Sequence, residues 1–385
     1  MWLFNSSIGR KFVMAVTGAC LVLFVTFHVL MNSVALIWPT AYNQVCEFLG
    51  ANWYALVASA GLAALFILHI VYAFWLTIQN RRARGNDRYE VTSRPPQVEW
   101  ASKNMLVLGI VVLAFLVVHL IQFWAKMQWQ ELRHAELSVL PQLEGVPVQP
   151  AQGTLFIQMA FSQVWTPIVY IIGFIALWFH MNHGFWSMFQ SAGWNGMSWL
   201  PRLKKISCWW TTIVIALFVA QAIVFTVHAR NEYYMNDYDL QEQYAETINE
   251  VAKKQIEDLQ FAQMGYVKQN QEAMATNDQA RMKEVEKEFL SKEGKDFVVN
   301  GDKLIAAYDK LCPEINDTQE FNMFRSLVKN LTSACMQYGV EIPGMTEGAQ
   351  MQAPVQQIPV EQTPAAPEVD PQVAPTQDND NNQQN

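Results

Sequence analysis

The chain of 385 residues lacks the paired-cysteine motifs that hold the common metal centres. Iron–sulfur ligation, structural zinc and covalent haem attachment depend on Cys-x-x-Cys and related spacings, so none of the three has support. Cys312 and Cys335 lie in the C-terminal region and could pair if that region is in an oxidising compartment. The five cysteines are Cys20, Cys46, Cys208, Cys312 and Cys335.

Charged residues are absent from five long apolar runs. A helix needs ~20 apolar residues, at a rise of ~1.5 Å each, to cross a hydrocarbon core of ~30 Å, and every run is long enough. The first run is too long for the core of a signal peptide, and no A-x-A-like cleavage site follows it, so we expect it to span the membrane. The sequence predicts an all-α membrane protein with five transmembrane helices. They are placed at residues 12–37, 53–78, 104–125, 163–188 and 206–229.

Acidic residues are scarce in the part of the chain that holds these runs and abundant after it. From Arg230 onward there are 13 Lys+Arg and 27 Asp+Glu, out of totals of 26 and 34, so the first part is basic and the second acidic. We predict a transmembrane domain at 1–230, an acidic, mostly helical extension at 231–343 and a disordered tail at 344–385. The tail is rich in Pro, Gln and Asn and cannot bury a core. The acidic extension argues against nucleic acid as a partner.

Lys and Arg in the loops indicate the orientation, because positively charged loops stay in the cytoplasm. Between the predicted helices, one side of the membrane holds only Lys126 and Arg133. We therefore expect the N-terminus in the cytoplasm and, after five crossings, the extension in the periplasm, with the helices in a bacterial inner membrane. The basic residues on the cytoplasmic side are Arg10, Lys11, Arg81, Arg82, Arg84, Arg88, Arg94, Lys103, Arg202, Lys204 and Lys205.

Four of the five runs carry a histidine well inside the predicted helix: His28, His69, His119 and His180. The helical rise places His28 ~25 Å and His119 ~24 Å from the cytoplasmic boundary. His69 is ~18 Å and His180 ~12 Å from the same boundary. The depths predict two pairs, an outer pair of His28 with His119 and an inner pair of His69 with His180.

These pairs have the arrangement that a membrane-embedded haem requires. In an up-down-up-down four-helix bundle the first and third helices are diagonal neighbours, and so are the second and fourth. Two imidazoles from diagonal helices can hold a haem iron with no open coordination position, which suits electron transfer. We predict two b-type haems in a four-helix bundle, the outer iron on His28 and His119 and the inner iron on His69 and His180. Histidines that hydrogen-bond between helices or relay protons are the alternative.

Three further histidines have other expected roles. His183 lies three residues after His180 on nearly the same helical face, so spacing alone leaves it as an alternative ligand of the inner haem. His134 falls in an outer loop and His228 at the outer end of the fifth helix. We expect both to be solvated.

Small residues recur at fixed distances from the histidines. Gly18 and Gly109 each lie ten residues before an outer histidine, and Gly173 lies seven before His180. Glycine leaves room for a macrocycle beside a helix, and ordinary close contact between helices is an equally good explanation for each one.

Glu47 is the only acidic residue in the expected outer loop between the first two helices, residues 38–52. A carboxylate near the level of the outer haem could accept a proton from a quinol as its electrons leave. A solvated loop glutamate is the alternative, so Glu47 is a candidate catalytic residue on position alone.

The histidine segments together resemble a known family over about residues 1–230. The fourth, Phe179-His180-x-x-x-Gly184-Phe185-Trp186-Ser187, resembles the fourth-helix haem motif of the single-subunit, two-haem cytochrome b anchors of succinate dehydrogenases and fumarate reductases. Three further segments resemble that family's first three ligand sites. They are Phe27-His28-Val-Leu-Met-Asn32, His69-Ile-Val-Tyr72 and Val118-His119.

The resemblance implies a function for the first 230 residues. It implies His180 rather than His183 as the ligand, menaquinone as the quinone, and a quinol-linked glutamate roughly where Glu47 stands. It also implies two partner subunits on the cytoplasmic face: an FAD-containing flavoprotein, which interconverts succinate and fumarate, and an iron–sulfur subunit. The resulting heterotrimer could form a dimer. This chain would carry electrons for the respiratory chain and the tricarboxylic acid cycle without forming the dicarboxylate site. The family does not include the extension.

Two other functions are compatible with buried histidines. A haem b anchor of a hydrogenase or formate dehydrogenase would pass electrons in the same way but bind different soluble subunits. A haem-free, proton-coupled transporter would use the histidines as a relay and normally needs carboxylates inside its spans. The five runs contain none, which counts against the transporter.

Overall fold

The computed structural model describes residues 6–84, 100–194 and 196–343, and nearly all of their regular structure is α-helical. Met1–Pro343 form one compact unit. The tail at 344–385, which the composition predicts to be disordered, lies outside the described residues, as does most of the basic segment before Lys103.

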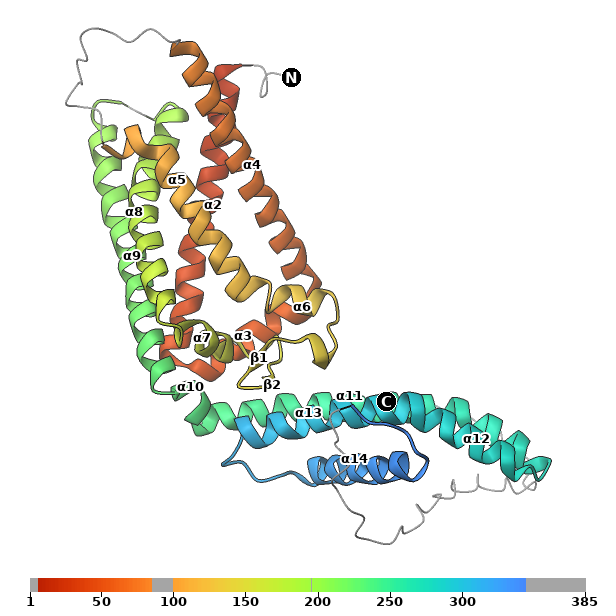
Figure 1. Ribbon diagram of the computed structural model, residues 1–385. Helices are drawn as coiled ribbons and strands as arrows, with labels where there is room; N and C mark the ends of the chain where they lie inside the picture. The colour runs from red at the N-terminus through yellow and green to blue at the C-terminus, as the bar shows by residue number, and fades with distance from the viewer. Residues whose placement is uncertain (1–5, 85–99, 195, 344–385) are drawn as a thin grey trace, which may run out of the picture. The chain divides into compact units, whose positions relative to one another are not determined.

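Five helices are long and apolar enough to cross a membrane, which confirms the predicted number of spans (Figure 1). Most of them run past the predicted limits where the sequence turns polar, because a helix continues into water until a capping or breaking residue ends it. The third helix finishes as a short π-helix, η1. The spans are α2 Ser7–Ile37, α4 Trp53–Arg84, α5 Trp100–His119 with η1 Leu120–Trp124, α8 Trp165–Ser191 and α9 Trp199–Arg230.

Helices α2 and α8 lie at the centre of this bundle. Helix α8 packs against α2, α5 and α9, and α2 also packs against α4 and α9. At one contact, a Cβ added to Gly173 of α8 would lie 2.4 Å from Cγ of Phe115 on α5. Gly173 therefore allows close helix packing, which is the second of the two explanations that the sequence offers for it.

The segment between the first two spans is a helix, α3 Pro39–Ala51, and the sequence-based expectation of a loop is wrong. Trp38 precedes a proline, which disfavours α-helical backbone at Trp38, and α2 therefore ends at Ile37. Pro39 then starts the new helix, because proline fits the first turn, where its missing N–H has no partner to lose.

The connection between α5 and α8 also contains regular structure. A two-residue hairpin turns at Glu144 and Gly145, whose φ angles of 50° and 89° are the positive values that a type I′ turn needs. Helix α7 follows, and it is almost completely buried. The elements in order are α6 Gln128–Leu132, the 3₁₀ helix η2 Leu137–Val139, β1 Gln142–Leu143, β2 Val146–Pro147 and α7 Gly153–Phe161.

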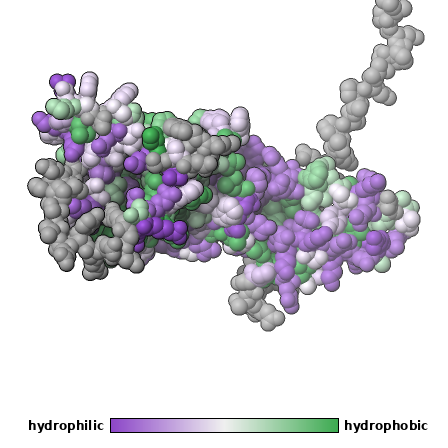
Figure 2. Space-filling view, turned by 90° about the horizontal axis from the view of Figure 1, so that it is seen from above, coloured by the Kyte–Doolittle hydropathy of each residue, from purple (hydrophilic) through white to green (hydrophobic). Residues whose placement is uncertain are grey.

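The extension is built of helices, with α13 and α14 packed against each other and against α11. Its surface is largely hydrophilic, with apolar residues scattered over it (Figure 2). Its elements are α10 Tyr233–Asn236, α11 Tyr238–Ala275, α12 Gln279–Phe289, the π-helix η3 Leu290–Gly294, α13 Lys295–Leu311 and α14 Gln319–Gln337.

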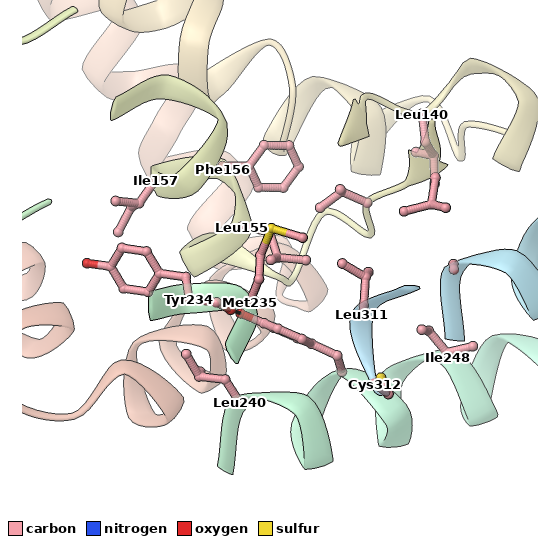
Figure 3. Close-up of a cluster of buried hydrophobic side chains, with 14 of the residues drawn as sticks. Leu140, Leu155, Phe156, Ile157, Tyr234, Met235, Leu240, Ile248, Leu311 and Cys312 are labelled. Carbon is pink, nitrogen blue, oxygen red and sulfur yellow. Dashed lines mark hydrogen bonds between the residues drawn. The ribbon is translucent and has the colours of Figure 1, made fainter. Parts of the chain in front are cut away.

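The extension shares one hydrophobic core with the loops that join the spans (Figure 3). Side chains from α7, among them Leu155 and Phe156, lie in the same buried cluster as Tyr234 of α10, Leu240 of α11 and Leu311 of α13. Removing so much apolar surface from water is the main favourable term in such packing. Residue 230 is thus the end of α9 and not the boundary of a separately packed domain.

Three hydrogen-bonding contacts hold α3 and α7 against α9 and α11. Asn43 of α3 donates to Gln243 of α11 at 2.9 Å. The hydroxyl groups of Thr154 and Tyr244 lie 2.7 Å apart. Gln158 donates to the carbonyl of Ala229 at 2.7 Å. Polar groups removed from water need such partners, so these contacts determine how α7 sits between α9 and α11.

Cys312 and Cys335 are both free and buried, so the structure does not show the disulfide that the sequence leaves open. Burial raises the pKa of the Cys312 thiol to about 12. Cys335 donates to the carbonyl of Leu290 at 3.7 Å. Both behave here as small apolar side chains of the extension core.

We predict that Gly153→Ala destabilises the protein by ~1–3 kcal/mol, as overpacking of a full core does. The added Cβ would lie 2.5 Å from Sγ of Cys46 and 2.8 Å from Cε1 of Tyr42. Gly265→Ala is the matched control, because nothing lies within 4 Å of its added Cβ on exposed α11. Thermal unfolding of the purified chain should show a lower midpoint for the first variant only, and equal midpoints would contradict the packing described.

Candidate functional site

The four histidines inside the spans meet in two pairs. The ring centroids of His28 on α2 and His119 on α5 are 5.8 Å apart. Those of His69 on α4 and His180 on α8 are 6.4 Å apart. These are the pairs that the depth estimates predict. The His28–His119 pair lies toward the extension and the His69–His180 pair toward the opposite end, and we call them the outer and inner pairs.

The separation of the inner pair matches that expected for two imidazoles that share one metal. With nitrogen–metal bonds of ~2 Å on opposite sides of the metal, the two ring centroids would be ~6.3 Å apart. The inner pair, at 6.4 Å, has this spacing, and the outer pair is 5.8 Å apart. The rings of each pair meet edge-to-face, with interplanar angles of 69° and 85°.

A hydrogen-bonded chain determines the tautomer of His119. Gln122 donates from Nε2 to Thr166 at 3.0 Å, which points its Oε1 toward Tyr170. Tyr170 donates its single hydroxyl proton to that Oε1 at 3.0 Å. Its oxygen, 3.2 Å from Nδ1 of His119, must then accept the Nδ1 proton. Nε2 of His119 is left with a free lone pair, which is the group that a metal binds.

His69 has the same arrangement with a simpler partner. Oγ1 of Thr17 donates to the carbonyl of Val13 at 2.9 Å and lies 3.1 Å from Nδ1 of His69. With its proton already committed, the hydroxyl accepts from Nδ1–H, and Nε2 of His69 again carries the lone pair. Thr17 is only 2% exposed, so this contact is shielded from solvent.

The other two histidines have different surroundings. Nε2 of His28 lies 3.1 Å from the amide nitrogen of Asn32. An amide nitrogen only donates, so this Nε2 is an acceptor and also carries a lone pair, which a metal would take in place of Asn32. Nδ1 of His180 is buried and has no hydrogen-bond partner within the described residues.

Two glycines leave space beside the inner pair. A Cβ on Gly18 of α2 would lie 3.6 Å from Cε1 of His69, and one on Gly109 of α5 would lie 3.5 Å from Cε1 of His180. Each inner histidine therefore faces a glycine of a neighbouring helix. All four helices contribute to this level, two with imidazoles and two with the smallest residue, and the arrangement fits a flat group held between them.

The remaining candidates lie away from the pairs. The ring of His183 is 4.8 Å from Trp186, and the structure places His180 rather than His183 opposite His69. Glu47 is exposed, as expected for a solvated glutamate, and it lies on helix α3 rather than in a loop. His134 is exposed.

The expectation that His228 is solvated needs correction. Its side chain is only partly exposed, and its ring centroid lies 4.4 Å from that of Tyr233 and 5.6 Å from that of Tyr234. The chain turns back just after α9, through the left-handed backbone of Glu232, and lays α10 over this histidine. Local sequence gives no sign of that turn.

Sequence reasoning missed Thr17, Gln122, Thr166 and Tyr170. Gln122 is 8% exposed, and it lies in η1, the π-helical turn that begins directly after His119. Such turns insert one residue into a helix and occur often at functional sites. A buried amide in a predicted span was the available signal, because polar groups there need partners on other helices.

The imidazole pairs can be compared with the two kinds of metal site that histidines form in proteins. Among the described residues, no group of three or more His, Cys, Asp or Glu side chains could hold a metal ion. Protein sites for bare ions use three or four side chains, whereas a haem iron takes only its axial ligands from the protein. At the inner level, Nε2 of His69 carries a free lone pair, and Gly18 and Gly109 lie beside the two imidazoles.

Comparisons with protein-family models, curated proteins and solved structures find no match to this chain. Fold and site together define an all-α protein with five helices able to cross a membrane and two imidazole pairs between four of them.

We predict that Tyr170→Phe lowers stability by ~1–3 kcal/mol, because it leaves buried groups on His119 and Gln122 without a partner. Tyr54→Phe is the control, since Tyr54 is 45% exposed at the end of α4. Thermal unfolding of both variants in the same detergent measures the difference. Equal stability would show that the chain of hydrogen bonds from Thr166 to His119 contributes nothing.

Proposed function

We propose that this protein is the membrane anchor and dihaem cytochrome b subunit of a succinate:quinone oxidoreductase or quinol:fumarate reductase. One observation carries the proposal, which is the meeting of four span histidines in two pairs at two levels. In this proposal His28 and His119 hold one b-type haem, and His69 and His180 hold the other.

The two levels suit the transfer of electrons through the membrane. Gly18 marks the inner level on α2, since it faces His69, and His28 follows ten residues later on the same helix. Ten residues of helix rise ~15 Å, about half of a hydrocarbon core. Two redox centres at this spacing divide one long transfer across the bilayer into shorter steps.

The residues around the pairs have definable roles. Haem bound here would supply one-electron chemistry at an iron that shuttles between its ferrous and ferric states. Tyr170 and Thr17 keep the Nδ1 proton of His119 and His69 in place, which fixes ring orientation and increases the electron density at Nε2. Aromatic rings such as Phe24, stacked 5.3 Å from His28, limit the access of water.

The proposal includes a reaction partner at each end of the bundle. At the end opposite the extension, Arg81, Arg82, Arg202 and Lys205 are exposed and would form the docking surface for the iron–sulfur subunit, with the flavoprotein beyond it. Menaquinone would exchange electrons at the outer pair. Glu47 stays a candidate proton acceptor for the quinol, and its exposure on α3 allows exchange with water. The spans would lie in a bacterial inner membrane with the extension in the periplasm.

Haem content and the reduced-minus-oxidised spectrum of the purified chain test the proposal. We expect two b-type haems per chain, and one in each of His28→Ala and His69→Ala. His183→Ala is the matched control and should keep two, because its ring lies on Trp186 rather than opposite His69.

Other results of this experiment would contradict the proposal in defined ways. If the wild-type chain contains no haem, the four histidines would be interpreted as a proton relay, and the transporter would be the favoured function. Loss of one haem in His183→Ala would make His183, rather than His180, the ligand of the inner haem. If the chain contains two haems but co-purifies with hydrogenase or formate dehydrogenase subunits, it would still be a dihaem cytochrome b, and the proposed partners would be wrong.

A second prediction tests the space beside the inner pair. Gly109→Leu should reduce the haem content from two to one while keeping all four histidines, because the new side chain fills the space next to His180. Gly61→Leu is the control, as nothing lies within 4 Å of a Cβ at Gly61. If Gly109→Leu retains both haems, Gly109 serves helix packing only.

A further inference from the structure

The far end of α11 forms a two-helix hairpin with α12. Tyr266 of α11 packs edge-on against Phe289 at the end of α12, with ring centroids 5.2 Å apart, and Val285 between them in sequence is 1% exposed. Between Leu259 and Ala273, however, no described residue of α11 is buried. Two helices bury only the stripe between them, and their other faces stay open.

One open face of this hairpin carries large exposed apolar side chains. Phe261 is 76% exposed and Met264, one helical turn later, is 63% exposed. Val267 and Met274 continue the exposed apolar positions along α11. Large apolar side chains that gather on one face of a water-exposed helix mark an interaction surface. We call the face formed by Phe261 and Met264 the α11 stripe, since Val267 and Met274 lie ~120–140° around the helix from Phe261.

Charges flank the stripe in a self-complementary order. Glu257 lies four residues before Phe261, and Lys268 lies four residues after Met264, so both charges fall on the same helical face as the apolar pair. Both are exposed. If a second α11 runs antiparallel with the two-fold axis midway between Phe261 and Met264, each Phe261 meets a Met264 and each Glu257 meets a Lys268. The face is therefore self-complementary, and no partner other than a second copy of this chain is needed to pair its side chains.

We propose that the α11 stripe is a homodimer interface, at which two copies of this chain pair their α11 helices antiparallel. The two hairpins would then bury the stripe as an antiparallel four-helix arrangement, a common solution for helical hairpins. Complementary flanking charges fix the register and the antiparallel sense, as they do in paired helices generally.

The geometry satisfies the condition that a membrane imposes on such a dimer. Two copies in one bilayer must be related by an axis along the membrane normal, so only a helix that runs across that normal can meet its own copy antiparallel. Helix α11 runs across the direction of α8 and α9 (Figure 1). The turn at Glu232 and the contacts of Gln243 with Thr40 and Asn43 hold its first turns in this direction.

The test measures the mass of the purified full chain in nanodiscs or detergent against concentration. We expect a dimer, and a mostly monomeric chain for Phe261→Glu. Because Phe261 contacts solvent, this change leaves the monomer core intact. Met323→Glu is the matched control, since Met323 is 58% exposed on α14 of the same extension, and it should remain dimeric.

Charge reversal tests the register and the identity of the partner. Glu257→Lys and Lys268→Glu should each raise the dimer dissociation constant by about tenfold or more, because like charges then face each other. The double variant should return close to wild type, and Lys329→Glu on α14 should have no effect. A monomeric wild type, a dimer that persists in Phe261→Glu, or no recovery in the double variant would each overturn the proposal. The haem content plays no part in these outcomes.

Discussion

Polar side chains inside a hydrocarbon layer need hydrogen-bond partners, and in this bundle several of them find those partners on a different helix. The spans are helices because no water is present there to bind free backbone groups. His69, His119 and Gln122 each contact a side chain of another helix and so help to decide how the helices face one another. Thr17 on α2 meets His69 on α4, and Tyr170 on α8 meets His119 on α5. Glycines at the same levels let the helices approach, so the polar contacts and the close packing support each other.

The same contacts connect packing with chemistry. A proton held on Nδ1 leaves the opposite nitrogen of the ring with a free lone pair, and the chain Thr166–Gln122–Tyr170 decides this for His119 without any charged group. The π-helical turn after His119 brings Gln122 into that chain.

The extension is part of the same construction and not an appended domain. Helix α7 lies between α9 and α11, with Gln158 bound to Ala229 and Thr154 beside Tyr244, and its apolar side chains lie in one core with those of α10 and α13. The extension thereby gains a fixed direction at its start, while the far half of α11 keeps an uncovered apolar face. Because the start of α11 is held in place and its far half has an uncovered apolar face, that half is suited to binding another protein chain.

The sequence by itself determined the five spans and the pairing of the histidines by depth. Both follow from local quantities, the lengths of uncharged runs and the constant rise of a helix, so no knowledge of contacts was needed. Only the tertiary structure decided that α3 is a helix, that Gly173 packs against Phe115, that His228 is covered by α10, and that Tyr170 and Gln122 complete the outer pair. Each of these depends on residues far apart in the chain, and a hydropathy pattern carries no information on which of them will meet.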